Sequence, residues 1–366
     1  MKYKLGEICK IVSGTTPKTS IAEYWDGDIK WLTPAEIKDD SYTIYDTFRK
    51  ITLLGKEKSG LNLFPKGTVI LSSRAPIGKV AIAGCDMCCN QGFKNLICSE
   101  KVYNKYLYWF LKTKKDYLNS LGRGATFKEI SKQIVSEIII DLPSYNEQGK
   151  IVDKLERLQK IVAIRKKQLL QLDKLTKALF VEMFGDMESN PKGWRKSTLG
   201  DECYYIKDGP HKSPKYLDGT DGIPFISTRN IVNGAGIDWS TAKYISETDY
   251  IECIKKCHPE KGDILYSKGG TTGIAKFVDT DIRFANWVHV AVLKFGEQLD
   301  GKFLECMLNM DYCYAQSQVL TRGIANRDFV LSAIAQVKIY VPSVDLQKQY
   351  TEFVRQIDKH KLPIID

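Results

Sequence analysis

The sequence predicts two α/β (α+β) domains of similar fold, joined by a long helix and followed by a second, shortened helix. One ordered set of short motifs occurs twice along the chain. Each copy alternates short runs of β-branched and aromatic residues with runs of helical spacing. Between the copies, positions 150–184 contain neither proline nor glycine, which is typical of one continuous helix. We therefore expect two similar domains in a pseudo-two-fold arrangement.

The repeat defines the domain limits. Matching segments occur in the same order at offsets of 194 to 199 residues: 5–7 and 199–201, 66–72 and 261–267, 78 and 273, 121–124 and 320–323, 138–144 and 337–343, 148 and 347. Copies of this length are too long for solenoid units, so each is expected to form a domain with a connector. The predicted limits are 1–145, 146–185 for the long helix, 186–343, and 344–366 for the shortened helix.

Within each copy, the pattern of residues predicts a mixed sheet covered by helices. Runs bounded by glycine, proline and asparagine indicate strands at 29–32, 69–72 and 80–83, and again at 224–227, 264–266 and 288–295. Apolar residues at helical spacing indicate helices at 105–121 and 301–320. Both copies therefore have α/β content.

The long helix carries an apolar seam at alternating steps of three and four residues, which favours pairing with another helix. The predicted helix-pairing residues of the first helix are Ile151, Leu155, Leu158, Val162, Leu169, Leu172, Leu179 and Met183. The second helix repeats the spacing at Leu346, Tyr350, Phe353 and Ile357, and we expect it to pack antiparallel on the first. Because it is shorter, half of the first helix would lack this partner. That half would recruit another chain, or the seam would be buried on its own domain.

Composition places the chain among folded, basic proteins. Its 366 residues are 43% hydrophobic and 27% charged, which argues against disorder. The net charge of +10 would attract a polyanion, although many basic proteins bind no nucleic acid. We find no signal peptide, no apolar run that could span a bilayer and no paired cysteine framework, so we expect a cytoplasmic protein. Neither cysteine group, at 85–98 or 253–258, has the spacing of a structural zinc site, so no metal is expected.

The order of domain, long helix, domain and second helix resembles the specificity subunit of type I restriction-modification systems. Local strings agree: Leu-Gly-Glu-Ile at 5–8, Gly-Thr-Thr-Pro at 14–17, Tyr-Trp at 24–25, Trp-Leu-Thr-Pro at 31–34, Leu-Phe-Val-Glu-Met-Phe-Gly-Asp at 179–186 and Asn-Pro-Lys-Gly-Trp at 190–194. The resemblance covers essentially the whole chain. It implies that each domain is a target recognition domain for half of a split DNA site, and that the helices set the gap between the halves.

The resemblance also implies partners. Members of this family bind two DNA adenine methyltransferase subunits and, in restriction complexes, an ATP-driven endonuclease subunit. We therefore expect no cofactor in this chain, S-adenosylmethionine on the methyltransferase partner, and ATP and Mg on the endonuclease partner. The second helix is shorter than is usual in the family, which leaves two outcomes open: docking of a second methyltransferase, or self-association through the uncovered seam.

Candidate DNA-contact residues lie in glycine-containing loops at corresponding places of the two copies. Arg, Lys, Asn and Gln read base edges or hold phosphates, and small hydroxyls near glycine also hold phosphates. The candidates of the first copy are Thr15, Thr16, Lys18, Ser73, Arg74, Lys79, Asn90, Gln91, Lys94, Arg123, Thr126 and Lys128. Those of the second copy are His211, Lys212, Thr228, Arg229, Asn230, Lys268, Thr271, Thr272, Asn286, Arg322, Asn326 and Arg327. The copies differ most within these clusters, so we expect them to read different half-sites.

Catalytic motifs are missing from the sequence. There is no phosphate-binding Gly-Lys-Ser/Thr loop, no complete dinucleotide fingerprint, and no Asn- or Asp-Pro-Pro-aromatic string of an adenine methyltransferase. The four histidines are scattered and suggest no hydrolytic site. We therefore expect a non-catalytic DNA-recognition subunit. The alternatives are a structural adaptor that reads no DNA, and a stand-alone DNA methyltransferase or nuclease.

Overall fold

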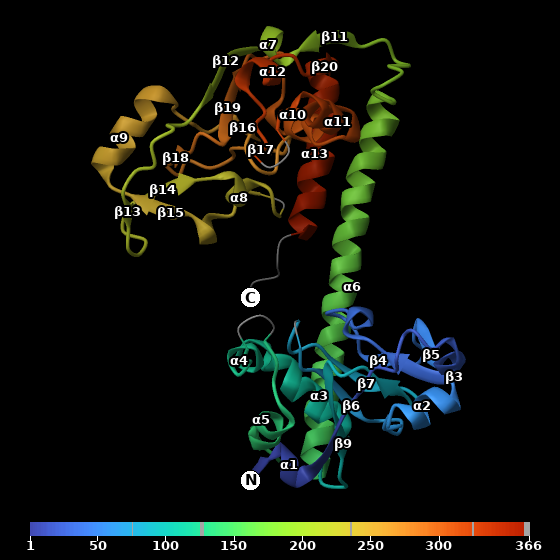
Figure 1. The fold of residues 1–366 in the computed structure, drawn as a ribbon. Coiled ribbons are helices and arrows are strands. Elements are labelled where there is room, and N and C mark those ends of the chain that lie inside the picture. Colours follow the sequence, from blue (N-terminus) through green and yellow to red (C-terminus); the bar gives the residue numbers. More distant parts are fainter. Residues whose placement is uncertain (75, 125–127, 235, 324–325, 362–366) are drawn as a thin grey trace. The chain divides into compact units, whose positions relative to one another are not determined.

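The computed structural model describes residues 1–74, 76–124, 128–234, 236–323 and 326–361. It divides into two compact units, Met1–Ile164 and Arg165–Asp366 (Figure 1). The division falls inside the long helix α6 (Tyr145–Phe184), so this helix is shared by the two units rather than forming a separate domain. Among the described residues, no helix is both long enough and apolar enough to cross a membrane.

The first unit contains a larger and a smaller sheet with helices packed around them. The larger sheet has the strand order β2-β9-β6-β7-β4 and the smaller one the order β5-β3-β8, while β1 pairs with β10. In chain order its elements are β1 (Lys2–Lys4), α1 (Leu5–Ile8), β2 (Cys9–Ser13), η1 (Ala22–Tyr24), β3 (Trp25–Leu32), η2 (Pro34–Glu36), β4 (Thr43–Ile44), β5 (Arg49–Ile51), α2 (Leu53–Lys58), β6 (Val69–Ser72), β7 (Val80–Ala83), β8 (Cys88–Cys89), β9 (Phe93–Cys98), α3 (Asn104–Thr113), α4 (Lys115–Ser120), α5 (Lys132–Glu137) and β10 (Ile139–Asp141).

The second unit repeats this plan. Its sheets have the orders β12-β19-β16-β17 and β13-β15-β14-β18, and β11 pairs with β20. In chain order its elements are β11 (Arg195–Thr198), α7 (Leu199–Glu202), β12 (Cys203–Asp208), β13 (Tyr216–Leu217), β14 (Ile223–Ile226), α8 (Thr228–Ile231), η3 (Trp239–Thr241), β15 (Lys243–Ile245), α9 (Glu247–Lys256), β16 (Ile264–Ser267), β17 (Ala275–Phe277), β18 (Ala285–Asn286), β19 (Val290–Phe295), α10 (Gly301–Leu308), α11 (Asp311–Leu320), α12 (Leu331–Ile334), β20 (Lys338–Val341) and α13 (Val344–Lys361).

The two units therefore have the α/β fold and the internal duplication that the sequence predicts. The strands that form the centre of each larger sheet, β6 and β16, are buried along their whole length, as expected for a strand covered on both faces. Helix α3 contacts β6 and β7, and α10 contacts β16 and β17, so the two helices contact corresponding strands in the two units. One strand of each unit has no counterpart: β4 in the first unit and β13 in the second.

The single helices predicted at 105–121 and 301–320 are each divided in two. In the second unit the break follows α10 at Asn309, whose side-chain Oδ1 accepts a hydrogen bond from the backbone N–H of Ala275 (3.0 Å) and whose Nδ2 donates to the Ala275 carbonyl (2.9 Å). An asparagine that pairs with a strand backbone in this way competes with continued helix formation. The prediction of one helix was wrong because the apolar spacing continues across the break.

A buried glutamine fastens the outgoing helix to each unit. The side chain of Gln148, on α6, accepts a hydrogen bond from the N–H of Tyr103 (2.8 Å) and donates to the carbonyls of Lys101 (2.9 Å) and Pro143 (3.0 Å). Gln347, on α13, makes the matching three bonds, to Asp300 (2.8 Å), Gln298 (3.0 Å) and Pro342 (2.9 Å). Both glutamines are fully buried. The glutamine that follows the Pro-Ser motif in both copies is thus the joint between domain and helix.

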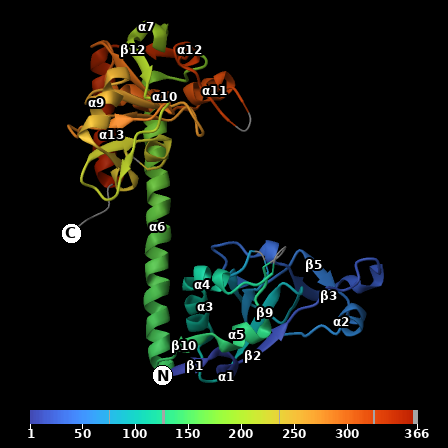
Figure 2. The same cartoon turned by 60° about the vertical axis from the view of Figure 1, so that its left-hand side comes forward.

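Within the second unit, α13 lies against the C-terminal half of α6, as both views of the fold show (Figures 1 and 2). The Tyr350 hydroxyl donates to the Thr176 carbonyl (3.3 Å), and its ring packs edge-on against Phe180. Further along α13, Lys361 pairs with Asp173 at 3.0 Å. Later residues of α13 therefore meet earlier residues of α6, so the helices pair antiparallel as predicted.

The buried face of α13 differs from the predicted one. Tyr350 is buried, but Phe353 is 52% exposed, and Val354 is the residue that packs inward at 2% exposure. A spacing of three or four residues is compatible with either Phe353 or Val354 on the buried face. In the structure Val354 lies on that face, together with Gln347, Tyr350 and Thr351. The remaining predicted helix-pairing residues of the second unit are half-buried: Leu169, Leu172, Leu179, Met183, Leu346 and Ile357.

In the first unit, the predicted seam on α6 is largely exposed. Leu155 is half-buried, whereas Ile151, Leu158 and Val162 are 37%, 58% and 52% exposed. The first half of α6 is therefore fastened to the first unit by Gln148, by the buried Val152 and by the ion pair of Glu156 with Lys105 (2.9 Å), whereas its apolar residues beyond Glu156 are exposed.

Candidate nucleic-acid interface

Four loops of the first unit are joined by backbone hydrogen bonds into one surface, which we call the first loop face (residues 14–18, 73–74, 76–79, 90–92, 121–124 and 128–130). The N–H of Thr15 donates to the carbonyl of Cys89, at the start of the 90–92 loop (3.0 Å). The N–H of Ser73 donates to the carbonyl of Gly92 (2.7 Å), and its carbonyl accepts from Ile130 (2.9 Å). The loops that carry the first copy's candidate residues are therefore neighbours in space.

The second unit holds the corresponding loops in the same way, and we call this surface the second loop face (residues 209–216, 268–274, 286–290, 320–323 and 326–329). The N–H of Lys268 donates to the carbonyl of His289 (2.9 Å), and the carbonyl of Lys268 accepts from the N–H of Phe329 (2.7 Å). These are the counterparts of the bonds that Ser73 makes. The duplicated motifs thus encode a duplicated set of loop contacts.

A glycine is required where the first of these loops meets the third. A Cβ on Gly14 would lie 2.1 Å from the carbonyl oxygen of Asn90, and one on Gly209 would lie 1.8 Å from that of Asn286. No side chain fits at such distances, since the neighbouring atoms belong to the backbone. The sequence motif that begins at Gly14 therefore marks a close backbone approach that recurs in the second unit.

Each loop face presents a five-residue tip closed by an arginine and an acid. Arg123 and Glu129 exchange backbone hydrogen bonds of 3.0 and 2.9 Å, and Arg322 and Asp328 exchange bonds of 2.9 and 2.9 Å. The tips between them, 124–128 and 323–327, have equal length but different side chains. Equal backbone closure with unequal side chains is the arrangement expected of loops that bind different targets on one scaffold.

A buried lysine anchors each tip through the closing acid. Lys94 Nζ lies 3.1 Å from Glu129 Oε1, and Lys268 Nζ lies 3.1 Å from Asp328 Oδ1; both lysine side chains are 7% exposed. Burial alone would raise the pKa of Glu129, but hydrogen bonds from Arg74 and Lys94 outweigh it and place the pKa below the usual value. The carboxylate therefore stays ionised between two cations.

The two anchoring lysines come from different places in the fold. Lys94 lies on β9, whereas Lys268 follows β16, at the position that Ser73 occupies in the first unit. Where the first unit has Lys94, the second has the buried residue Ala291. Lys268 also lies 3.3 Å from Asp208, a second acid. Both units thus have a buried lysine next to the acid that closes the tip, but the two lysines occupy different positions in the repeated sequence.

This geometry corrects six of the predicted DNA contacts. Lys94 and Lys268 are internal ion-pair partners, and four further candidates are buried with internal hydrogen bonds: Ser73, Asn230, Thr272 and Asn286. Asn230, for example, accepts a bond from the N–H of Ser227 (2.9 Å) and so caps α8, while Asn286 donates to the Val290 carbonyl (2.8 Å). Their residue types suit base recognition, but here the same hydrogen-bonding groups are used inside the fold.

The other candidates lie at the surface, apart from one that cannot be placed. Thr126 lies outside the described residues. The exposed candidates are Thr15, Lys18, Arg74, Gln91, Arg123, Lys128, His211, Lys212, Arg229, Thr271, Arg322 and Asn326. The half-buried ones are Thr16, Lys79, Asn90, Thr228 and Arg327. The structure thus brings two arginines, a glutamine and several lysines together on the first loop face, with Arg74 fixed by a 2.8 Å ion pair to Glu129.

The candidate list omitted residues that shape both loop faces. Glu129 and Asp328 are 199 positions apart, the same offset as Arg123 and Arg322, so the repeat contained the signal that they correspond. His289 was also omitted, and its ring packs edge-on against Trp287 with centroids 4.5 Å apart. Burial, and then the charge of Lys268, lower the pKa of this histidine, which favours the neutral imidazole that can both donate and accept hydrogen bonds.

Nothing in the described part of the chain forms a metal site, since no three His, Cys, Asp or Glu side chains there are grouped so as to hold an ion. The loop faces offer charge, amide groups and backbone groups instead. Such surfaces can hold phosphates and read base edges, which are the two tasks of a DNA interface.

Comparison with known proteins identifies the family. The family described as type I restriction modification DNA specificity domain matches the chain twice, over residues 1–174 and 191–365. The type I restriction enzyme MjaIX specificity subunit of Methanocaldococcus jannaschii is 33% identical over 97% of this chain and 85% of its own length. The MjaVIII specificity subunit of the same organism is 24% identical over the same shares.

Solved structures share the fold. The S subunit of the type I restriction-modification system from M. genitalium aligns with a TM-score of 0.54 at 18% identity, over 99% of this chain and 90% of that one. A chain from a study of complex assembly and conformational transition of the type I R-M system aligns with a TM-score of 0.57 at 19% identity, over the same shares. The family matches each repeated unit, and the first relative extends along nearly the whole chain. The chain therefore belongs to the family of type I restriction-modification specificity subunits.

Proposed function

We propose that the two units read the two halves of a bipartite duplex DNA site, each through its own loop face. The observation that carries this proposal is the matched pair of loop faces, whose backbone contacts agree while the exposed side chains differ. An adaptor that reads no DNA would need no such divergence on an otherwise retained scaffold. Arg74, Gln91 and Arg123 on the first face, and Arg322 and Asn326 on the second, are of the types that contact base edges.

In this proposal, α6 and α13 set the spacing between half-sites and dock two DNA adenine methyltransferase subunits. The open apolar side of the first half of α6 supports a partner there, since exposed apolar surface of this kind marks interaction sites. A restriction endonuclease subunit would complete the assembly, with self-association as the competing use of the open seam. The chain itself would be non-catalytic, with S-adenosylmethionine bound by the methyltransferase, and ATP and Mg by the endonuclease subunit.

Methylation mapping tests the function directly. Single-molecule sequencing of cells that carry the chain and its methyltransferase should reveal a bipartite adenine-methylated motif that is missing from cells without the chain. No new motif in cells where the complex forms would contradict the proposal and favour the adaptor.

Arginine substitutions test whether reading is modular. Arg74→Ala should relax base preference in one half-site and Arg322→Ala in the other, each by about 1–3 kcal/mol of discrimination. Mapping the methylated motif in each variant gives both half-sites in one experiment. Equal loss of preference in both half-sites, from either variant, would refute modular reading.

A further inference from the structure

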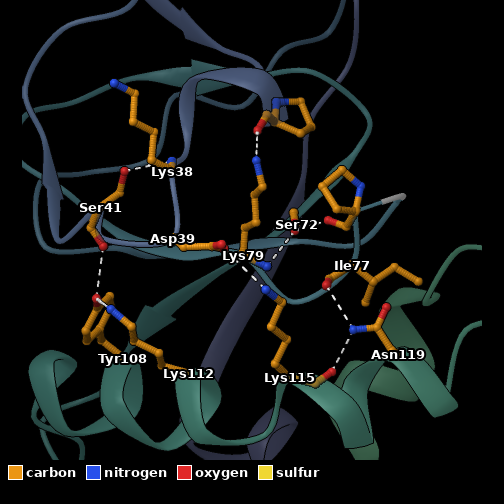
Figure 3. Close-up of polar contacts among 12 residues, drawn as sticks. Lys38, Asp39, Ser41, Ser72, Ile77, Lys79, Tyr108, Lys112, Lys115 and Asn119 are labelled. Atoms are coloured by element: carbon orange, nitrogen blue, oxygen red, sulfur yellow. Dashed lines mark hydrogen bonds and ion pairs between the residues drawn. The ribbon is translucent and has the colours of Figure 1, made fainter. Parts of the chain in front are cut away.

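Four lysines of the first unit gather beside the first loop face: Lys38, Lys79, Lys112 and Lys115 (Figure 3). They come from three segments. Lys38 belongs to the turn that precedes β4, and Lys79 ends the 73–79 loop. Lys112 and Lys115 lie on the consecutive helices α3 and α4, which form the third segment. We call them the lysine cluster; only Lys79 was among the residues predicted from the sequence.

Hydrogen bonds hold the three segments together. The Tyr108 hydroxyl, on α3, donates to the Ser41 carbonyl (2.9 Å) and accepts from Lys112 Nζ (2.7 Å). Asn119, on α4, donates to the carbonyl of Ile77 in the 73–79 loop (3.2 Å). The hydrogen bonds of Tyr108 and Asn119 to backbone carbonyls therefore fix the segments that carry the four lysines.

The charges of the cluster are only partly balanced. Lys115 Nζ lies 3.2 Å from Asp39, but that carboxylate is 82% exposed and the lysine 50% exposed, so the pair adds little to stability. In the described part of the chain, neither Lys38 nor Lys112 has an ion-pair partner. Burial lowers the pKa of Lys112, while Asp40 and Asp39 act in the opposite direction. In the described part of the chain, Lys115 is thus the one lysine of the four that makes an ion pair, so internal pairing does not explain the cluster.

Lys79 connects the cluster to the first loop face. Its Nζ donates to the carbonyl of Pro34 (3.3 Å), and Pro34 lies against Gly92, where a Cβ would be 3.2 Å from the proline Cγ. Gly92 is the residue whose carbonyl binds the Ser73 N–H. The positive surface is thus continuous with the loops proposed to read bases.

The second unit has no such cluster at the corresponding place. Ile274 matches Lys79, since the N–H of each donates to the Oγ of the shared serine, Ser267 or Ser72, at 2.8 Å. By the same alignment of the repeats, Val232, Asn309 and Tyr314 stand where Lys38, Lys112 and Lys115 stand. The lysines of the second unit gather instead at 212, 215, 255 and 256 around a different cavity. The lysine cluster therefore belongs to the first unit alone and is not part of the duplicated scaffold.

We propose that the lysine cluster binds backbone phosphates of duplex DNA next to the half-site read by the first unit. This inference rests on the proposed function and adds a phosphate-binding site to it. Lysines that hold phosphates fix the position of a protein on the duplex without reading its sequence. The two units would consequently contact the phosphates of the DNA backbone at different places relative to their loop faces.

The test measures how DNA affinity depends on salt, with the complex of this chain and its methyltransferase on a duplex carrying the mapped motif. A protein loses about 0.9 from the slope of log K against log salt for each phosphate contact removed. The double variant Lys112→Ala/Lys115→Ala should lower the slope by about 1.8 and bind several-fold more weakly, with base preference unchanged. Asp39→Asn should have the opposite effect on affinity, since it removes a nearby negative charge.

A charge-matched control is available in the same unit. Lys58→Ala/Lys66→Ala removes two exposed lysines, one on α2 and one before β6, at the end of that strand opposite the loop face. This control should leave the salt slope unchanged. Equal slopes for the cluster variant and the wild-type complex would overturn the inference. Loss of methyltransferase binding with an unchanged DNA slope would also overturn it and assign the cluster to an acidic protein surface. A wild-type complex with no preference for any duplex would refute the proposed function itself.

Discussion

In each unit a buried lysine contacts the acid that closes the tip loop, but the two lysines come from different parts of the fold. In the first unit Lys94 reaches Glu129 from β9, and in the second Lys268 reaches Asp328 from the end of β16. The backbone contacts around the tip loops are otherwise the same in both units. This difference suggests that the fold needs a buried positive charge next to the acid that closes the tip loop. The sequence position of the lysine that provides this charge can differ. Substitutions in matched pairs can test how far this equivalence extends.

The glutamine joints should give the largest effect. Gln148→Leu and Gln347→Leu keep the side-chain volume but leave three partly buried backbone groups without a partner, each costing about 1–3 kcal/mol. We expect each variant to destabilise its own unit by about 3–5 kcal/mol. Hydrogen exchange resolved by unit would measure this loss. A loss of the same size in both units from one substitution would show that the units do not fold separately.

Exchanging the anchoring lysine should give a somewhat smaller effect. Lys94→Ala leaves Glu129 paired with Arg74 alone, whereas Lys268→Ala removes the lysine that contacts Asp328 and one of the two lysines that contact Asp208. We therefore expect losses of up to about 2–3 kcal/mol, with the larger loss for Lys268→Ala. The double variant Ser73→Lys/Lys94→Ala builds the arrangement of the second unit into the first and should recover part of the loss. Urea unfolding of the three variants would check this. A double variant no more stable than Lys94→Ala would show that the two arrangements are not interchangeable.

Low pH should lower the stability of the second unit through the carboxyl group of Glu202, because the first unit has no carboxyl group at the matching position. Arg195, then Ser197 and Gln298, lower the pKa of Glu202 to about 2, and the matching residue of the first unit is the buried Ile8. Because the folded pKa lies below the unfolded value of 4.5, Glu202 stabilises the fold above about pH 4.5, and this contribution is lost as the pH falls toward 2. Glu202→Gln should remove about 1–3 kcal/mol of this pH dependence. Unit-resolved hydrogen exchange between pH 5 and 2.5 is the measurement. If the variant kept the full acid sensitivity, another group would be responsible.

The smallest effect concerns the face of α13. Val354→Ala should cost about 1–2 kcal/mol, because Val354 is 2% exposed. Phe353→Ala should change stability by less than about 0.5 kcal/mol, because Phe353 is 52% exposed. Leu155, which matches Val354 in the first unit, is only half-buried, so Leu155→Ala should cost less than Val354→Ala. Thermal unfolding would rank the three variants. The opposite order for Phe353 and Val354 would restore the face predicted from the sequence.

The sequence predicted the duplicated fold, the long helix and the antiparallel second helix, because each depends on ordered motifs or on helical spacing. The buried roles of Lys94, Lys268 and Asn230 could not be predicted, since they depend on which strands pair and on which loop closes over them. Residue type alone gave the same expectation for Arg74 and Lys94, yet only Arg74 is exposed. The break at Asn309 escaped prediction because its cause is a contact with β17, which is distant in the sequence.

The second acid beside Lys268 bears on how one lysine arrangement could change into the other. A chain with lysines at both positions would place two lysines against one carboxylate, and a chain with neither would leave that acid with one cation fewer. Asp208 changes this balance, because with two acids present two lysines can each find a partner. In the second unit Asp208 already contacts two lysines, Lys256 at 2.7 Å and Lys268 at 3.3 Å, so this point of the fold accommodates more than one buried cation.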